Sequence, residues 1–378
     1  MTTTASRLAG DRGLAELAAR RFPLVPRPKP TCRPLTDRIR RVRQQAERAG
    51  QPTGTTLLHA AEAHNFAALI LSDCAMPTHA RALCWRQFDV FASHGPYDQT
   101  TAKLALQPLI NIGRLDARTG DSAAAYRLHH AMLQAAKTRT TAVIDGRHLD
   151  LADIVRPGED HTEIVGWLWT VLLADGLRAL CRAGRLPEAH TQAERHHGIG
   201  ERLLDGRQVA IIAHSAAGEH TTALHLLEIT TTGTEWERAV AACLTVLCFR
   251  RAGQRTSAAI EAMCEAYLQL EPEPQHAAFH VGLGLTAASL ATHSDVTRPV
   301  IRRAAYLAAD AADAYAAREI LSLADLSSVA ERTIEILHDV VRHASLGTAM
   351  PPPLLDDLLK AVEVSEQQLA RFLSPRPG

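Results

Sequence analysis

The sequence is poor in aromatic residues and has no excess of charge of either sign. Phe, Trp and Tyr make up 4% of the 378 residues, and 41 Lys and Arg side chains balance 41 Asp and Glu side chains. Because sheets favour aromatic and β-branched residues, an apolar fraction of 46%, mostly Ala and Leu, favours helices instead. A chain without net charge has no overall field that would draw it to nucleic acid or an anionic membrane. We therefore expect an all-α protein with neither kind of partner.

Cysteine pairs and export signals are also missing. The seven cysteines are scattered and form no C-x-x-C pair, which argues against a zinc ribbon or a redox motif. We expect them to be small buried residues in a reducing compartment. The first twenty residues lack the apolar core of a signal peptide. The most apolar stretch, 164–174, is shorter than the about 20 residues that span a bilayer. These features predict a cytoplasmic protein.

Recognisable catalytic motifs are absent from the sequence. It contains no P-loop, G-x-G-x-x-G, G-x-S-x-G or kinase signature. His276 and His280 have the spacing of two metal ligands on one helix, but Ala277 stands where the H-E-x-x-H motif needs glutamate. A second cluster, which we interpret as a solvated helix end, consists of His190, Glu194, His196 and His197. We expect no metal, no cofactor and no catalytic residue.

A proline-dense run divides the chain. Residues 23–34 cannot be helical and predict an extended linker that closes an N-terminal extension, 1–35. Helices with short breaks fill 36–372, and 373–378 form a flexible tail. Near 139–158, two alternating runs flank Asp145-Gly146, which predicts an exposed β-hairpin or loop inserted between helices. The expected helices are 36–50, 55–74, 77–94, 98–120, 122–137, 161–184, 187–196, 207–218, 221–230, 235–253, 256–270, 274–293, 297–317, 323–346 and 353–372.

The breaks between helices repeat one pattern, a glycine followed five residues later by an alanine. Gly184, Gly218 and Gly253 follow one another at 34 and 35 residues, and the longer gap before Gly184 contains the hairpin. Glycine can adopt the left-handed conformation that ends a helix. A small alanine lets the next helix cross closely. The pairs are Gly120 with Ala125, Gly184 with Ala189, Gly218 with Ala223, and Gly253 with Ala258.

This period and this pair of small residues resemble the tetratricopeptide (TPR) repeat. The resemblance covers roughly residues 55–275, and 275–372 only by helix length and pairing. The family's earlier small residue is kept as Gly113 but not in the other repeats. Residues 62–74 and 83–88 also resemble the repeat regions of actinobacterial regulators, although nothing in 1–54 matches their DNA-binding domain. The layout is similar to that of peptide-sensing regulators of Gram-positive bacteria.

The resemblance implies an α-solenoid of antiparallel helix pairs whose first helices line a concave groove. Asn and Gln side chains there can pair with the backbone of an extended peptide, and arginines can bind carboxylates. Asp205 also lies near this surface. The ligand-binding candidates are Asn65, Asn111, Arg114, Arg178, Gln208 and Arg250.

These features favour a non-enzymatic, regulatory scaffold that binds a peptide or protein segment in the groove. Three alternatives stay open. The chain could be a biosynthetic or modifying enzyme with a dispersed site. It could be a DNA-linked transcriptional regulator that uses the basic run 38–43. A homodimer is also left open.

Overall fold

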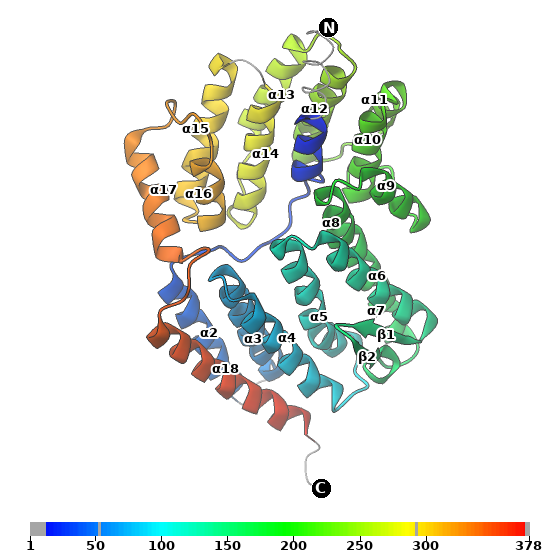
Figure 1. Ribbon diagram of the computed structural model, residues 1–378, viewed down its shortest axis with the longest axis vertical. Coiled ribbons are helices and arrows are strands. Elements are labelled where there is room, and N and C mark those ends of the chain that lie inside the picture. Colours follow the sequence, from blue (N-terminus) through cyan, green and yellow to red (C-terminus); the bar gives the residue numbers. More distant parts are fainter. Residues whose placement is uncertain (1–12, 52–53, 292–293, 375–378) are drawn as a thin grey trace. The chain divides into compact units, whose positions relative to one another are not determined.

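The computed structural model describes residues 13–51, 54–291 and 294–374, and within them the chain is all-α apart from one small hairpin (Figure 1). Residues 13–21 are also helical. The predicted tail lies outside the described residues from 375 onward. The elements are α2 (Leu35–Ala49), α3 (Thr56–Asp73), α4 (Pro77–Ala92), α5 (Gln99–Thr119), α6 (Ser122–Thr138), β1 (Thr141–Ile144), β2 (Arg147–Asp150), η1 (Leu151–Asp153), α7 (Glu159–Val171), the π-helix η2 (Leu172–Gly176), α8 (Leu177–Arg182), α9 (Leu186–Arg195), α10 (Asp205–Ala217), α11 (His220–Glu228), α12 (Glu235–Arg251), α13 (Ser257–Gln269), η3 (Pro274–His276), α14 (Ala277–Leu290), α15 (Ser294–Asp310), α16 (Ala314–Leu321), α17 (Glu331–Ala344) and α18 (Pro352–Leu373).

The chain forms two compact units, and both are discontinuous in sequence. Among the described residues, unit 1 comprises 13–32 and 180–342, and unit 2 comprises 33–179 and 343–374. This division differs from the expected one, in which 1–35 stood apart from a single repeat domain. Residues 22–34 are free of helix, as predicted, yet the segment before residue 33 packs into unit 1.

The repeated glycines end helices as predicted. Gly120, Gly184, Gly218 and Gly253 have φ angles of 97°, 72°, 83° and 68°, in the left-handed region that side chains disfavour. The partner alanines of the first three, Ala125, Ala189 and Ala223, are fully buried.

The prediction for the fourth alanine is wrong, because Ala258 is exposed. The helices α6, α9 and α11 begin two residues after their glycine, whereas α13 begins four residues after Gly253. Ile260 therefore occupies the buried position in the first turn of α13.

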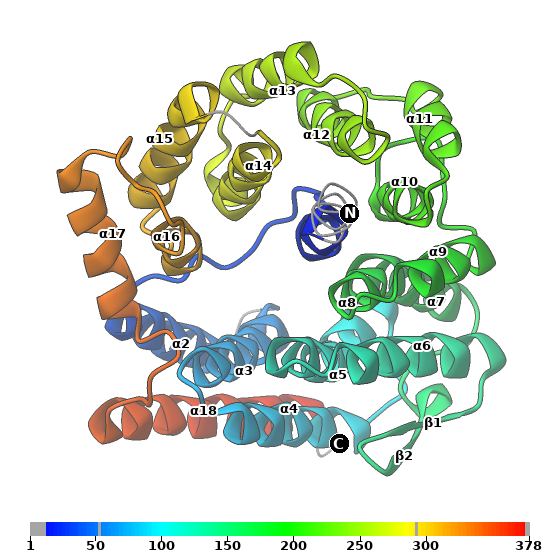
Figure 2. The same ribbon diagram turned by 45° about the horizontal axis from the view of Figure 1, so that its top comes forward.

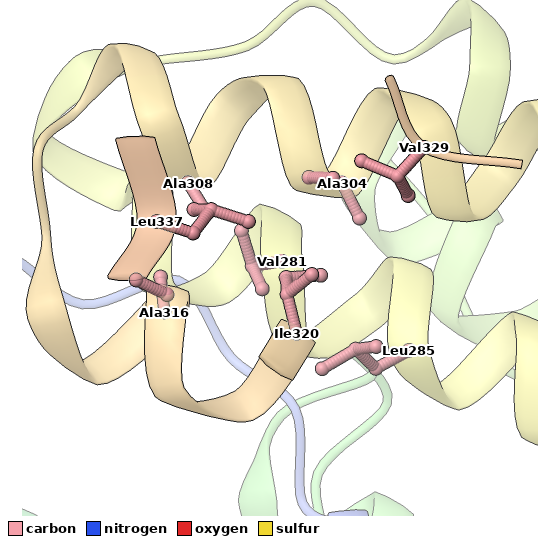
Figure 3. Close-up of a cluster of buried hydrophobic side chains, with 10 residues drawn as sticks. Val281, Leu285, Ala304, Ala308, Ala316, Ile320, Val329 and Leu337 are labelled. Atoms are coloured by element: carbon pink, nitrogen blue, oxygen red, sulfur yellow. The ribbon is translucent and has the colours of Figure 1, made fainter. Parts of the chain in front are cut away.

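In unit 1 each helix from α9 to α16 packs against its neighbour in sequence, and alternate helices also meet. The helices α10, α12, α14 and α16 form one such series, which we call the inner helices of unit 1. Figure 2 shows residues 13–32 on their side, with α11, α13 and α15 on the other. Side chains from α14, α15, α16 and α17 fill a hydrophobic core that includes Val281, Ala308, Ile320 and Leu337 (Figure 3).

Unit 2 contains α2–α6, the hairpin, α7 and η2, with α18 packed on α2, α3 and α4. The contact is specific: the buried Ser365 hydroxyl lies 3.1 Å from His64 Nδ1 and 2.9 Å from the Ala60 carbonyl oxygen, to which it donates. The C-terminal helix is therefore part of the core of unit 2.

Two predicted helices differ from the observed ones. The run expected at 297–317 is divided into α15 and α16 at Ala312, which adopts a φ of 48°, and at Asp313, whose carboxylate accepts the Tyr315 N–H at 3.0 Å. An alanine here takes the left-handed conformation that the sequence analysis assigned only to glycines. The helix expected from 323 begins at 331.

The apolar helix in unit 2 is longer than the stretch 164–174. In the part of the chain described, one helical run, Glu159–Arg182, is long and apolar enough to cross a membrane; its most apolar window of 18 residues has a mean hydropathy of 1.5, and 44% of that window is buried. The length argument made from the sequence therefore does not hold. Its part in unit 2 packs against α5 and α6.

The predicted hairpin is confirmed. β1 pairs antiparallel with β2, and the turn residues Asp145 and Gly146 have φ angles of 52° and 75°. The turn is exposed, but Ala142, Ile144 and Leu149 are buried. Asp145 Oδ2 also accepts a hydrogen bond from Trp85 Nε1 at 2.9 Å. The insertion is therefore fastened to α4.

Candidate functional site

A row of hydrogen-bonded polar side chains crosses three elements of unit 2. Asn111 Nδ2 on α5 donates to Asn65 Oδ1 on α3 at 3.0 Å. Asn111 Oδ1 accepts from Gln107 Nε2 at 3.0 Å and from Arg114 at 3.3 Å. Arg114 Nε donates to Asp175 Oδ2 on η2 at 2.9 Å. We call these five residues the polar ladder.

Helix geometry explains why the ladder forms. Gln107, Asn111 and Arg114 are spaced by four and three residues, so they lie on one face of α5. Asp175 belongs to a π-helix, a widened turn that changes the direction of side chains relative to an α-helix. Proteins often keep such a turn where function needs it.

Burial and charge act in opposite directions on the Asp175 carboxyl. Burial alone would raise its pKa, but the positive charges of Arg114 and Arg178 bring the pKa below the ordinary value. Arg178, the fourth predicted residue in this unit, thus acts on the same carboxylate. The ladder therefore ends in an anion that faces two arginines.

A buried histidine packs against α5, the helix that carries three residues of the polar ladder. His129 on α6 is buried, and burial lowers its pKa, so its ring is neutral at pH 7. The ring lies against Gly113 on α5, where a Cβ would be 2.5 Å from His129 Nε2. Only glycine fits at this approach, which accounts for the small residue that the sequence analysis noted.

The other two predicted residues lie in unit 1, and each binds the chain itself. The buried Gln208 on α10 accepts the Leu24 N–H at 2.7 Å and donates to the Leu24 carbonyl oxygen at 2.9 Å. Arg250 on α12 donates to the Leu290 carbonyl oxygen at 2.9 Å, at the end of α14. Gln208 thus pairs with the backbone of the chain's own non-helical segment, whereas Arg250 supports a helix terminus.

Sequence reasoning missed Gln107 and Asp175 in unit 2 and Asp313 and Glu319 in unit 1. Gln107 could have been found, because it lies one helical turn before Asn111. Asp175 could not have been found, because its side chain points where the π-helix directs it and the spacing of a regular α-helix does not predict that direction. Asp313 and Glu319 bind Cys32 and Arg21, which belong to the N-terminal extension that was expected to stand apart from the repeat domain.

The histidine clusters have local roles. His280 Nε2 accepts the Glu273 N–H at 3.2 Å, and His276 Nδ1 lies 3.3 Å from a Glu273 carboxylate oxygen. His190 packs its ring against that of His214, with centroids 4.6 Å apart. Within the described residues, no group of three or more His, Cys, Asp or Glu side chains is arranged to hold a metal ion. All seven cysteines are buried and none forms a disulfide, which confirms their predicted placement.

Four arginines of the basic run near the start of unit 2 have partners within that unit. Arg38 is buried and donates to Asp73 at 2.7 Å, and Arg40 donates to Asp37 at 2.7 Å. Arg41 lies over the Phe66 ring, 4.0 Å from its centroid, and Arg43 is 4.0 Å from Asp357. These partners compete with phosphate for the cations.

No protein-family model, curated protein or solved structure matches this chain, so the candidate sites are interpreted from the chain's own residues.

Proposed function

We propose that this chain is a cytoplasmic, non-enzymatic, TPR-like α-solenoid that binds an extended peptide or protein segment and acts as a regulator. Paired helices joined at left-handed glycines support the repeat assignment. Contacts between alternate helices support the repeat assignment as well. In such an array the first helix of each repeat packs against the first helix of the next repeat.

The observation that carries the proposal is the contact between Gln208 and Leu24. One side-chain amide holds both the N–H and the carbonyl of a residue in a non-helical segment. A carboxamide offers a donor and an acceptor together, so it recognises the backbone whatever the side chain. The inner helices of unit 1 thus hold a segment of the kind that we propose as a ligand.

In unit 2 the polar ladder offers the same chemistry to a separate peptide. Asn65 and Gln107 are half-exposed amides that can pair with a peptide backbone. A peptide carboxylate would take the place of Asp175 beside Arg114 and Arg178, since guanidinium groups bind carboxylates in pairs. We therefore assign ligand binding in unit 2 to the ladder and Arg178.

A selection from random linear peptides displayed on phage tests this function on the full chain. Enriched peptides are synthesised, and their Kd values are measured by fluorescence polarisation. We expect Asn111→Ala and Arg178→Ala to weaken binding by about ten- to a hundredfold, because each loses a buried polar partner worth about 1–3 kcal/mol.

The matched controls are Gln134→Ala and Arg127→Ala on α6, which change the same types of side chain away from the ladder. They should bind the selected peptides normally, and all four variants should melt near the wild-type temperature. Failure to enrich any linear peptide would contradict the proposal. So would full-strength binding by both ladder variants.

A further inference from the structure

Residues 22–32 are held in unit 1 at two points of their backbone. At one end Gln208 pairs with Leu24. At the other end, the Asp313 carboxylate accepts the Cys32 N–H at 3.2 Å, and the Cys32 carbonyl oxygen accepts the Ala314 N–H at 3.0 Å. The partners come from α10 and from the start of α16. The segment is therefore bound as an extended ligand would be, through N–H and C=O groups.

Two apolar side chains of residues 22–32 are buried in unit 1. Phe22 is 1% exposed and Leu24 is 8% exposed, although both lie in a stretch without helix or strand. Leu24 packs over Gly282 on α14, where a Cβ would lie 3.9 Å from Leu24 Cδ2. That distance is an ordinary van der Waals contact, so Leu24 lies against this face of α14. We call this contact the Leu24 subsite.

Cations of the segment meet acidic and aromatic groups of the inner helices. The Arg27 guanidinium contacts both carboxylate oxygens of Asp205 on α10. Lys29 Nζ lies 5.8 Å from the centroid of the Tyr315 ring on α16. A bidentate pair between arginine and a carboxylate is more selective than a single contact, because it fixes the direction of both groups. The surface thus distinguishes charge as well as apolar shape.

The middle of the segment is more exposed than its ends. Residues 27–30 are exposed, whereas Phe22, Leu24 and Cys32 are buried. Prolines at 23, 26, 28 and 30 keep the backbone extended, which lowers the entropy lost on binding. Release of the segment would expose Phe22 and Leu24, so the bound state is favoured unless a competitor replaces those contacts.

We propose that residues 22–32 are an intramolecular ligand that occupies a peptide site on the inner helices of unit 1. The external ligand is an extended peptide with two apolar residues at alternate positions and an arginine three residues after the second. This inference rests on the proposed function and gives a ligand class for unit 1. The tethered segment competes at an effective concentration on the order of millimolar, so an external peptide binds weakly until the segment is loosened.

A labelled synthetic peptide spanning residues 20–34 tests the inference on the full chain. It is titrated against the wild-type chain and against a chain carrying Leu24→Ala and Arg27→Ala, in which the groove is intact and the tethered competitor is weakened. We expect the peptide to bind the variant at least tenfold more tightly. Adding Gln208→Ala to that variant should remove at least tenfold of the gain, because the backbone contact with Leu24 is lost.

Two further measurements keep the test valid if the double variant folds poorly. Arg27→Ala alone alters a side chain that is 41% exposed, so it leaves the core intact and should still tighten binding of the peptide. In the wild-type chain, a millimolar excess of unlabelled peptide should accelerate hydrogen exchange at the Leu24 and Cys32 amides.

The inference is overturned if the peptide binds the wild-type and loosened chains equally, or if binding survives Gln208→Ala. The outcome is separable from that of the proposed function. Peptides bound to the polar ladder should respond to Asn111→Ala and not to Gln208→Ala. Loss of the 20–34 interaction alone would therefore leave ligand binding in unit 2 intact.

Discussion

His280 on α14 is buried and is held neutral by its surroundings. Burial lowers its pKa from 6.5 to about 4, with Glu273 opposing the shift and with His276 and Arg303 adding to it. The hydrogen bond from the Glu273 N–H also favours the neutral ring, because Nε2 can accept it only while Nε2 carries no proton. Protonation would thus break a contact and charge a buried ring.

This residue should make unit 1 sensitive to mild acid. The unfolded chain, with its pKa near 6.5, binds the proton more readily than the folded one, so the stabilisation is complete above that pH and is lost as the pH falls toward 4. By about pH 5 the loss amounts to about 2 kcal/mol. Urea unfolding of the wild type and of His280→Gln at about pH 7.5 and about pH 5 measures it.

The glutamine in His280→Gln does not titrate, and its carbonyl oxygen can accept the same hydrogen bond. We expect the acid-induced loss of unfolding free energy to be smaller in this variant by about 2 kcal/mol. Equal losses in both proteins would show that His280 titrates with an ordinary pKa.

At the scale of helices, the alanines five residues after the turn glycines set the distance of closest approach. Ala189 on α9 and Ala223 on α11 are fully buried, where α9 and α11 pack on α10. Ala189→Leu and Ala223→Leu should each lower the free energy of unfolding by about 1–3 kcal/mol through overpacking. Chemical unfolding monitored by circular dichroism measures the loss.

Ala258 provides the matched control for this prediction, since it has the same place in the sequence pattern but is exposed on α13. Ala258→Leu should change the free energy of unfolding by no more than about 0.5 kcal/mol. If all three variants unfold like the wild type, the crossings do not lie at the alanines.

Local signals explain why most elements could be predicted from the sequence. The glycine turns and the Asp145-Gly146 hairpin each depend on a few adjacent residues, and the structure has them where the sequence indicated. The break at Ala312 could not be predicted in this way, because it depends on Asp313, which caps α16 and also binds the distant Cys32. Contacts between residues far apart in sequence leave no local pattern.

The same distinction applies to the candidate sites. Helical spacing placed Asn111 and Arg114 on one face, and Asn65 joins them through a hydrogen bond. The partner of Gln208 could not be foreseen, because a proline-rich run predicts only that the backbone is extended. Its place in unit 1 depends on burial of Phe22 and Leu24, two apolar residues that a free linker would leave in water.

At the scale of the whole molecule, each unit is completed by a segment from one end of the chain. Residues 13–32 belong to unit 1, and α18 belongs to unit 2. Each segment contributes apolar core: Leu17, Phe22 and Leu24 are buried in the first, and Leu358 and Leu369 in the second. Full burial of one such side chain contributes about 1.5–3 kcal/mol. Two or three of them are a large share of the about 5–15 kcal/mol that stabilise a domain.

Removing either end should therefore weaken one unit more than the other. Without residues 1–32, we expect amide hydrogen exchange to accelerate in α10, α14 and α16, which contact that segment, and to stay near wild-type rates in α3 and α5. Without residues 352–378, the reverse should hold: α2 and α3 lose protection, while α12 and α14 keep it. Exchange followed by mass spectrometry resolves these helices in the two truncated chains. An equal increase in both units after either truncation would mean that the chain unfolds as one cooperative body. No increase would mean that the terminal segments add nothing to the cores in which they are buried.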